Sequence, residues 1–272
     1  MLLFKRPDEP ADFADIVKDA KQRVADAVAS GRKLKTEEDF PNLWTKFKDH
    51  FSKAQRGKCG FCERDTTTHW GDVEHYRPKN GLEDLPDDPN DRGKEDEYTG
   101  RLTEKRKLKP LFDMAYWWLA YEWSNYLLSC ARCNRTWKRC LFPIAEVPRP
   151  RAPRSGDVET PLLLSPFGSD DPTQHLAFNE FGAVEARGGS EMGRATIDTC
   201  GLDQPSLVRS RSFVARRVYH LLRDLEQAAT LEERKIALRR LRELGGDDEP
   251  HAGMVRSIVE VEVDIRWSEL FR

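Results

Sequence analysis

The chain has 272 residues, of which 34% are charged, and a formal net charge of −2. Its mean hydropathy is −0.72, and no apolar run approaches the roughly 20 residues of a membrane span, which argues against an integral membrane protein. The opening stretch Met1–Pro7 becomes charged too early to form the core of a secretion signal, so we expect a cytoplasmic protein with no membrane partner.

Residues 1–56 are predicted to be helical. Apolar side chains recur at helical spacing between Phe13 and Val28, and Gly31 is expected to end this helix. A second helix is predicted over residues 37–55, because aromatic side chains form one apolar stripe along it. Stripes of this kind pack in a core more often than they bind a ligand, so we interpret both helices as packing elements.

Two Cys-x-x-Cys motifs carry the clearest metal-binding signal. They place thiols at Cys59 and Cys62, and at Cys130 and Cys133. Four thiolates at this spacing are typical of a tetrahedral Zn²⁺ site, whereas disulfides are less expected in a long chain without a secretion signal. We therefore predict a structural zinc site that joins two segments far apart in the sequence.

The two remaining cysteines, Cys140 and Cys200, fall outside this pattern. We interpret both as buried thiols. Cys140 lies close to the second motif, however, so it stays open as an alternative zinc ligand.

Between the motifs, residues 57–79 are predicted to form a tight turn that leads into a strand pair, with β-type residues from His69 to Val73. Residues 80–107 are polar and acidic and are expected to form a mobile surface insertion. The aromatic stretch 111–128 is interpreted as a buried helix that runs into the strand or turn carrying Asn125. A further helix should begin near Cys133 and end at Pro143.

Local charge is uneven in this part of the chain. Residues 130–155 hold seven basic side chains and one acidic one, whereas residues 80–98 hold eight acidic side chains and two basic ones. A basic patch of this kind would attract a polyanion. The alternative is that the two oppositely charged blocks simply attract each other.

The C-terminal half begins with a linker rich in Pro and Arg, with Pro148, Pro150 and Pro153 in an extended conformation. A β-hairpin or irregular segment follows at 170–184. Helices are predicted at 190–200, 206–228, 231–244 and 250–270. The arginine-rich helix at 206–223 is either a contact for nucleic acid or a partner, or an ordinary solvated face.

A candidate catalytic constellation lies beside the predicted zinc site. Phosphodiester hydrolysis needs a base to deprotonate water and a cation to stabilise the leaving oxygen. His75 is the candidate base, because the pKa of histidine lies near neutral pH. Glu74 and Asn134 offer oxygen ligands for Mg²⁺ or Mn²⁺, and Asn125 would orient His75 through a ring nitrogen or the nearby backbone.

Other side chains around this constellation are given supporting roles. Asp72 should share a strand face with Glu74 and is a possible outer-shell ligand. Phosphate contacts are predicted for four basic residues, namely Arg77, Lys79, Arg135 and Lys138. Structural roles are predicted for His50, His69, His220 and His251. His175 is either structural or an accessory to the nuclease chemistry.

The set Glu74-His75, Asn125 and Asn134 resembles the HNH superfamily of ββα-metal endonucleases, in a variant that closes on Asn rather than His. Residues 40–217 further resemble the HNH nuclease subunit of Septu-type and retron-linked anti-phage systems. The runs that carry this resemblance are Gly57–Glu63, Val73–Lys79, Asn125–Cys130, Leu163–Pro166, Asp171–Leu176, Arg194–Ile197 and Gly201–Asp203. The resemblance implies a nucleic-acid substrate, DNA or RNA, and an ATPase partner of the ABC or SMC type.

We therefore predict an α+β protein, mostly helical, with a small zinc-stabilised ββα-metal (HNH) core. The predicted regions are an N-terminal helical region at 1–56, the nuclease core at 57–145 with its insertion at 80–107, a linker and irregular segment at 146–189, and a helical region at 190–272. The predicted function is a metal-dependent endonuclease. The alternative is a catalytically silent, zinc-stabilised adaptor that binds nucleic acid or protein.

Overall fold

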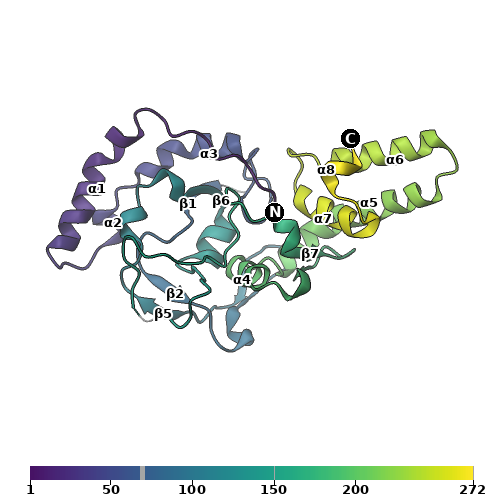
Figure 1. Cartoon of the computed structure of the whole chain (residues 1–272). Helices are drawn as coiled ribbons and strands as arrows, with labels where there is room; N and C mark the ends of the chain where they lie inside the picture. The colour runs from purple at the N-terminus through teal and green to yellow at the C-terminus, as the bar shows by residue number, and fades with distance from the viewer. Residues whose placement is uncertain (68–70, 150, 272) are drawn as a thin grey trace.

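The computed structural model of the protein describes residues 1–67, 71–149 and 151–271, without the side chains of residues 36 and 37. Figure 1 shows a larger body built around the paired strands β1 and β6, with helix α1 along one side of it. The helices of the C-terminal region extend from the opposite side of this body. This mixture of helices and small sheets confirms the general α+β prediction.

The N-terminal region is helical but more broken than predicted. Its elements are α1 (Phe13–Ala29), α2 (Thr36–Asp39), the 3₁₀ helix η1 (Leu43–Phe47) and α3 (Lys48–Ala54). Gly31 follows α1 with φ +71, as expected for a residue that ends a helix. The single helix predicted over 37–55 is wrong, because Pro41 drives Phe40 out of the helical region, to φ −116 and ψ 73.

Over the residues that the structure describes, the β structure consists of four two-stranded antiparallel sheets. The central pair joins β1 (Gly71–His75) to β6 (Tyr126–Cys130), with Gly71 opposite Cys130 and His75 opposite Tyr126. The other pairs are β2 (Leu82–Asp84) with β5 (Lys109–Phe112), β3 (Lys94–Glu95) with β4 (Leu102–Glu104), and β7 (Leu176–Phe178) with β8 (Val184–Ala186). The strand expected after the first cysteine motif is confirmed as β1, but its partner is the distant β6 and not a neighbouring strand within residues 57–79. The hairpin near residue 175 is confirmed.

Two segments between the cysteine motifs differ from prediction. The acidic segment 80–107 is not irregular: it supplies β2, β3 and β4, and it buries the Glu95 carboxylate, which pairs with Arg132 at 2.8 Å. The aromatic segment 111–128 holds no α-helix. It forms two short 3₁₀ helices, η3 (Trp117–Leu119) and η4 (Trp123–Asn125), whose large side chains fill space on several sides rather than along one helical stripe.

The C-terminal region is helical, as predicted. Its helices are α4 (Glu191–Cys200), α5 (Pro205–Gln227), α6 (Leu231–Leu244), α7 (Ala252–Val263) and α8 (Trp267–Leu270). The continuous helix predicted over 250–270 is wrong, because Asp264 adopts a left-handed conformation, with φ +53, that ends α7.

Three apolar clusters form the core of the described part of the chain. One surrounds the four cysteines of the two motifs and includes Leu163, Leu164 and Ile197. The second packs α1 and α3 against one face of the β1–β6 pair, and the third lies among α5, α6 and α7. Within the predicted linker, the nearly buried Arg149 side chain pairs with Glu159 at 2.5 Å. The region boundaries given above stay a prediction, and Pro150 lies outside the described residues.

Among the described helices, none combines the length and the apolar composition that crossing a bilayer requires.

Candidate metal centre and the adjoining site

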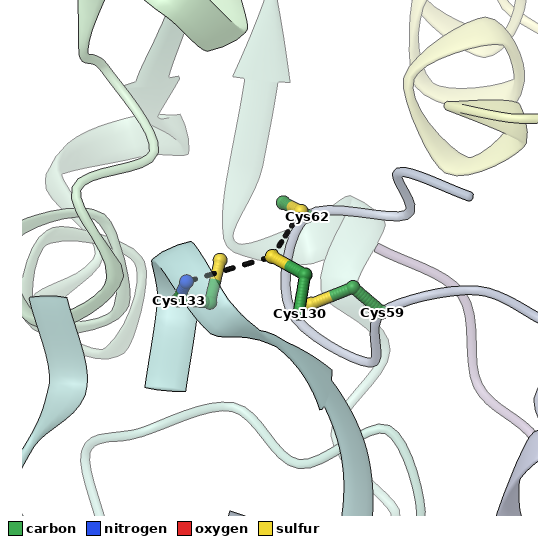
Figure 2. A group of neighbouring side chains, drawn as sticks. All are labelled: Cys59, Cys62, Cys130 and Cys133. Carbon is green, nitrogen blue, oxygen red and sulfur yellow. Dashed lines mark hydrogen bonds between the residues drawn. The ribbon is translucent and has the colours of Figure 1, made fainter. Parts of the chain in front are cut away.

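The four cysteines of the two motifs converge on one buried point. Their sulfur atoms all lie within 4.8 Å of one another, and Cys62 Sγ lies 3.8 Å from Cys130 Sγ. Figure 2 shows the side chains of Cys62, Cys130 and Cys133 turned toward this point, with Cys59 beside them. A tetrahedral zinc ion with Zn–S bonds of about 2.3 Å separates its ligands by about 3.8 Å. The cluster therefore has the composition and the spacing of a structural zinc site.

Local backbone geometry explains why the first motif forms a tight loop. Cys59 N–H donates to the Arg64 carbonyl at 3.0 Å, and Gly60 N–H donates to the Leu128 carbonyl of β6 at 2.9 Å. A Cβ on Gly60 would lie 2.7 Å from a side-chain carbon of Pro166, so only glycine fits between the two cysteines. The loop is thereby fastened directly to the strand that carries Cys130.

The thiols influence one another strongly because they are buried together. Hydrogen bonding with Cys130 and the other two thiols, followed by burial, raises the pKa of Cys133 well above its ordinary value. Four closely packed thiols cannot all lose their protons without a cation to balance the charge, and a bound zinc ion would supply that charge. Arg132 adds further positive charge, with its guanidinium 3.7 Å from Cys133 Sγ.

Glu74 and His75 project to opposite faces of β1, as neighbours on a strand do. Glu74 points toward the π-helix η5 (Arg132–Lys138), where its carboxylate lies 2.7 Å from Lys138 Nζ. Asp72 faces the same element and pairs with Arg135 at 2.6 Å. The predicted common face of Asp72 and Glu74 is confirmed, and it is the face that meets η5.

The His75 ring is buried on the other face, and the residue is 5% exposed. Its ring packs edge-on against Trp44 at 4.7 Å and Tyr126 at 5.2 Å between centroids. His75 Nε2 lies 2.9 Å from the carbonyl oxygen of Ala120, which can only accept, so Nε2 carries the proton. Burial lowers the pKa of His75 well below its ordinary value, which keeps the ring neutral with its lone pair on Nδ1.

Asn125 holds the chain just after His75. Its Oδ1 accepts from the Arg77 N–H at 2.8 Å, and its Nδ2 donates to the carbonyls of Arg77 at 2.9 Å and Leu119 at 3.1 Å. These contacts reach the backbone two residues after His75 and not its ring, whose Nε2 lies against the Ala120 carbonyl instead. That Asn125 orients His75 through this backbone stays a prediction.

Asn134 lies directly after Cys133 in η5, which the sequence predicted as a helix but not as a π-helix. The Arg139 N–H donates to the Asn134 carbonyl at 2.8 Å, a bond across five residues that widens the turn. Such turns occur often at functional sites. The helix ends at Lys138 and not at Pro143, because Arg139 has φ +47.

Lys138 corrects one of the predicted phosphate contacts. Its side chain is 0% exposed, and its ammonium contacts Glu74 Oε1 at 2.7 Å and donates to the His75 carbonyl at 2.9 Å. It therefore ties η5 to the end of β1 instead of reaching a ligand. The buried pair was missed because the sequence shows two charged residues 64 positions apart with no sign that they meet.

The other three predicted phosphate contacts lie nearer the surface. Arg135 is largely exposed. Arg77 lies 3.7 Å from a Glu159 oxygen, with its guanidinium 4.7 Å from the Phe142 ring centre. Lys79 lies over the Trp44 ring at 4.5 Å, beside His75. Their contact with phosphate stays a prediction.

The remaining candidate residues have structural partners. Cys140 lies outside the cluster and its thiol donates to the Asn80 carbonyl at 3.5 Å, which removes it as an alternative zinc ligand. Cys200 is buried, as predicted, whereas Cys140 is only partly buried. His175 Nδ1 lies 2.7 Å from the hydroxyl of Ser190, the residue that caps α4, which supports the structural interpretation. His69 lies outside the described residues.

The basic and acidic blocks partly neutralise each other. Arg132 pairs with Glu95, and Arg139 pairs with Glu83 at 3.0 Å. These contacts favour the simpler of the two interpretations given above, in which the blocks attract each other rather than a polyanion.

The fold and the cluster define a protein of mixed helices and small sheets with a buried four-cysteine site able to hold zinc. This chain is similar to the Septu protein PtuB of Bacillus mycoides (strain KBAB4), with 35% identity over 173 residues that cover 63% of this chain and 51% of that protein. The predicted resemblance to a protein of Septu-type systems is thereby confirmed. The chain spans about half the length of the curated relative it matches. No protein-family model matches the chain.

Proposed function

We propose that this chain is a metal-dependent HNH endonuclease that cleaves phosphodiester bonds in DNA or RNA, acting in an anti-phage defence complex with an ATPase of the ABC or SMC type. The observation that carries the proposal is the four-cysteine cluster between two segments. It fastens the strand pair with Glu74-His75 to the π-helix with Asn134. The relationship to a Septu protein supports the defence role.

His75 has the neutral ring that a general base needs, but the burial that lowers its pKa also makes the ring a weak base until water reaches it. The Nε2–H of the neutral ring donates to the Ala120 carbonyl, so Nδ1 is the nitrogen that would accept a proton from water. Trp44 and Tyr126 cover this ring. Substrate access therefore requires the Trp44 side chain to move away from His75.

Glu74 and Asn134 are the proposed ligands for Mg²⁺ or Mn²⁺. A carboxylate and a carboxamide are hard oxygen donors of the kind these ions prefer. The bound ion would stabilise negative charge on the leaving oxygen. The Lys138 ammonium lies next to Glu74, and Asn125 holds the backbone after His75 in place, so these two residues position the others and do not touch the substrate.

A catalytically silent adaptor is the second candidate, because the two central side chains are covered. Glu74 is 6% exposed and His75 is 5% exposed, and Glu74 is already paired with a lysine. An adaptor would use the zinc-stabilised body as a rigid platform and would need no access to His75.

Nicking of supercoiled plasmid by the full chain, with Mg²⁺ or Mn²⁺ and with or without a chelator, separates the two. We expect His75→Ala to lower the rate by about 10²- to 10⁴-fold, the usual contribution of a general base. His50→Ala is the matched control, because His50 is exposed and lies on α3, away from His75 in the sequence and outside the proposed site. His75→Gln guards against misfolding, and zinc content and thermal unfolding are read for each variant. Equal nicking by a folded His75 variant and the wild type would remove the nuclease proposal.

A further inference from the structure

The hairpin of helices α5 and α6, residues 205–244, differs in charge from the rest of the protein. It holds ten Arg and Lys residues and five Asp and Glu residues, a local charge of +5 within a chain of net charge −2. The remainder of the chain therefore carries −7. Figure 1 shows the α6 end of this hairpin extending away from the β1–β6 body.

Most of the basic side chains on this hairpin are exposed and have no carboxylate partner. Arg211 is the buried exception, and it donates to the Leu202 carbonyl at 2.6 Å. Across the parts of the chain that the structure describes there are 18 ion pairs, and none uses a basic residue of the hairpin. The exposed set is Arg209, Arg216, Arg217, Arg223, Arg234, Lys235, Arg239, Arg240 and Arg242.

The arrangement of these side chains suits a chain of phosphates. Arg216, His220 and Arg223 are spaced four and three residues apart and so share one face of α5. Arg216 and Arg223 are about 10 Å apart along the helix axis, at 1.5 Å per residue. Beside them, Arg217 and Arg240 line a hollow of about 500 Å³ between the two helices, together with Glu243 and Glu249.

We propose that the α5–α6 hairpin binds the phosphate backbone of nucleic acid, as a contact remote from the candidate catalytic site. The proposal rests on the function proposed above in taking nucleic acid as the ligand. Arginine forks match phosphate oxygens in pairs. Arginine is also enriched in protein–protein interfaces, so residue type alone does not identify the ligand. The density of charge favours a polyanion, because nine exposed basic side chains on two successive helices match the repeated charge of a phosphate backbone.

The test is binding of the full chain to a fluorescently labelled DNA duplex of about 30 base pairs, measured by anisotropy over a salt titration. No Mg²⁺ or Mn²⁺ is added, so the duplex stays intact. The test variant is Arg216→Gln, Arg217→Gln and Arg240→Gln together. We expect affinity to fall at least tenfold and the slope of log K against log salt to fall by about 3, because three phosphate contacts are lost.

A control variant changes the charge by the same amount elsewhere. Lys18→Gln, Lys46→Gln and Lys53→Gln remove three exposed positive charges from the N-terminal helical region. We expect this variant to bind DNA nearly as tightly as the wild type. Unchanged binding by the hairpin variant, or an equal loss in the control, would overturn the proposal. So would loss of binding to an acidic partner protein while DNA binding stays intact.

The binding measurement is independent of the cleavage measurement. A wild-type chain that binds DNA through the hairpin but never nicks plasmid would contradict the nuclease proposal and leave the hairpin proposal standing. If the wild type and the triple arginine variant nick plasmid equally well and bind DNA equally well, the hairpin proposal is contradicted and the nuclease proposal stands.

Discussion

Different interactions stabilise two regions of the protein: the body around the β1–β6 pair and the four cysteines, and the α5–α6 hairpin. In the body, residues 57–63 meet residues 128–133 across a long stretch of sequence, and buried polar groups such as Glu74, Lys138 and Asn125 join the elements. In the hairpin, two successive helices pack through apolar side chains that include Ala215, Val218 and Leu241. We infer that the folding stability of the body depends on a metal and on a few buried charges. The stability of the hairpin depends on apolar burial and on local features such as helix caps.

The largest effect should come from loss of one zinc ligand. We expect Cys133→Ser to abolish zinc binding and to unfold the body, because a structural zinc site contributes about 10–16 kcal/mol in small domains, comparable to a whole protein's stability. Zinc content is measured by atomic absorption and the body by near-ultraviolet circular dichroism. Helical signal from the hairpin should survive in part.

Cys140→Ser is the matched control for that experiment. Cys140 lies seven residues after Cys133 but outside the cluster, where its thiol bonds only to a carbonyl. The control should keep one zinc per chain and nearly the wild-type melting temperature. A Cys133→Ser variant that melts with the wild type would show that the cluster does not hold the body together.

Lys138→Met should have the next largest effect. The substitution keeps the length of the side chain but leaves the buried Glu74 carboxylate without its ammonium partner, which typically costs about 3–5 kcal/mol. Urea unfolding followed by tryptophan fluorescence measures the change. Arg139→Met removes the neighbouring and more exposed pair with Glu83, and should cost less than about 1 kcal/mol. Equal losses in both variants would contradict a special role for the buried pair.

The sequence predicted the features that depend on residue spacing within one segment or on a characteristic metal-binding motif. The zinc cysteines have a fixed spacing, so their convergence could be predicted, and so could α4, α5 and α6, whose apolar positions repeat with helical spacing. The placement of Asp72 and Glu74 on one strand face follows from strand geometry alone. These features need no knowledge of distant contacts.

What the sequence did not predict depends on contacts between distant segments. Glu95 looked like one more acid in a solvated insertion, yet it is buried between Arg132, Trp137 and Ser206. Lys138 looked like a phosphate contact because it lies one turn beyond Asn134, yet its partner lies on β1. The π-helix likewise has no local signal in the sequence. The burial and the partners of such side chains depend on which charged residues come together in the folded core, and this is not visible in the local sequence.

The smallest expected effect on stability concerns the start of α6, and it tests whether the hairpin is stabilised independently of the body. Thr230 Oγ1 accepts from the Glu233 N–H at 3.2 Å, and Glu233 Oε2 accepts in return from the Thr230 N–H at 2.9 Å. Removing such a cap costs about 1 kcal/mol. We therefore expect Thr230→Ala to lower hairpin stability by that amount, seen as faster amide exchange in α6.

Thr230→Ser keeps the capping oxygen and should exchange like the wild type. Neither variant should change zinc content or amide exchange in β1 and β6, because the cap lies in the hairpin and contacts only its own turn. If Thr230→Ala speeds exchange in β1 and β6 as much as in α6, the two regions unfold together. That result would contradict the inference that the body and the hairpin are stabilised separately, because the loss of a local cap would then have opened both regions in one cooperative step.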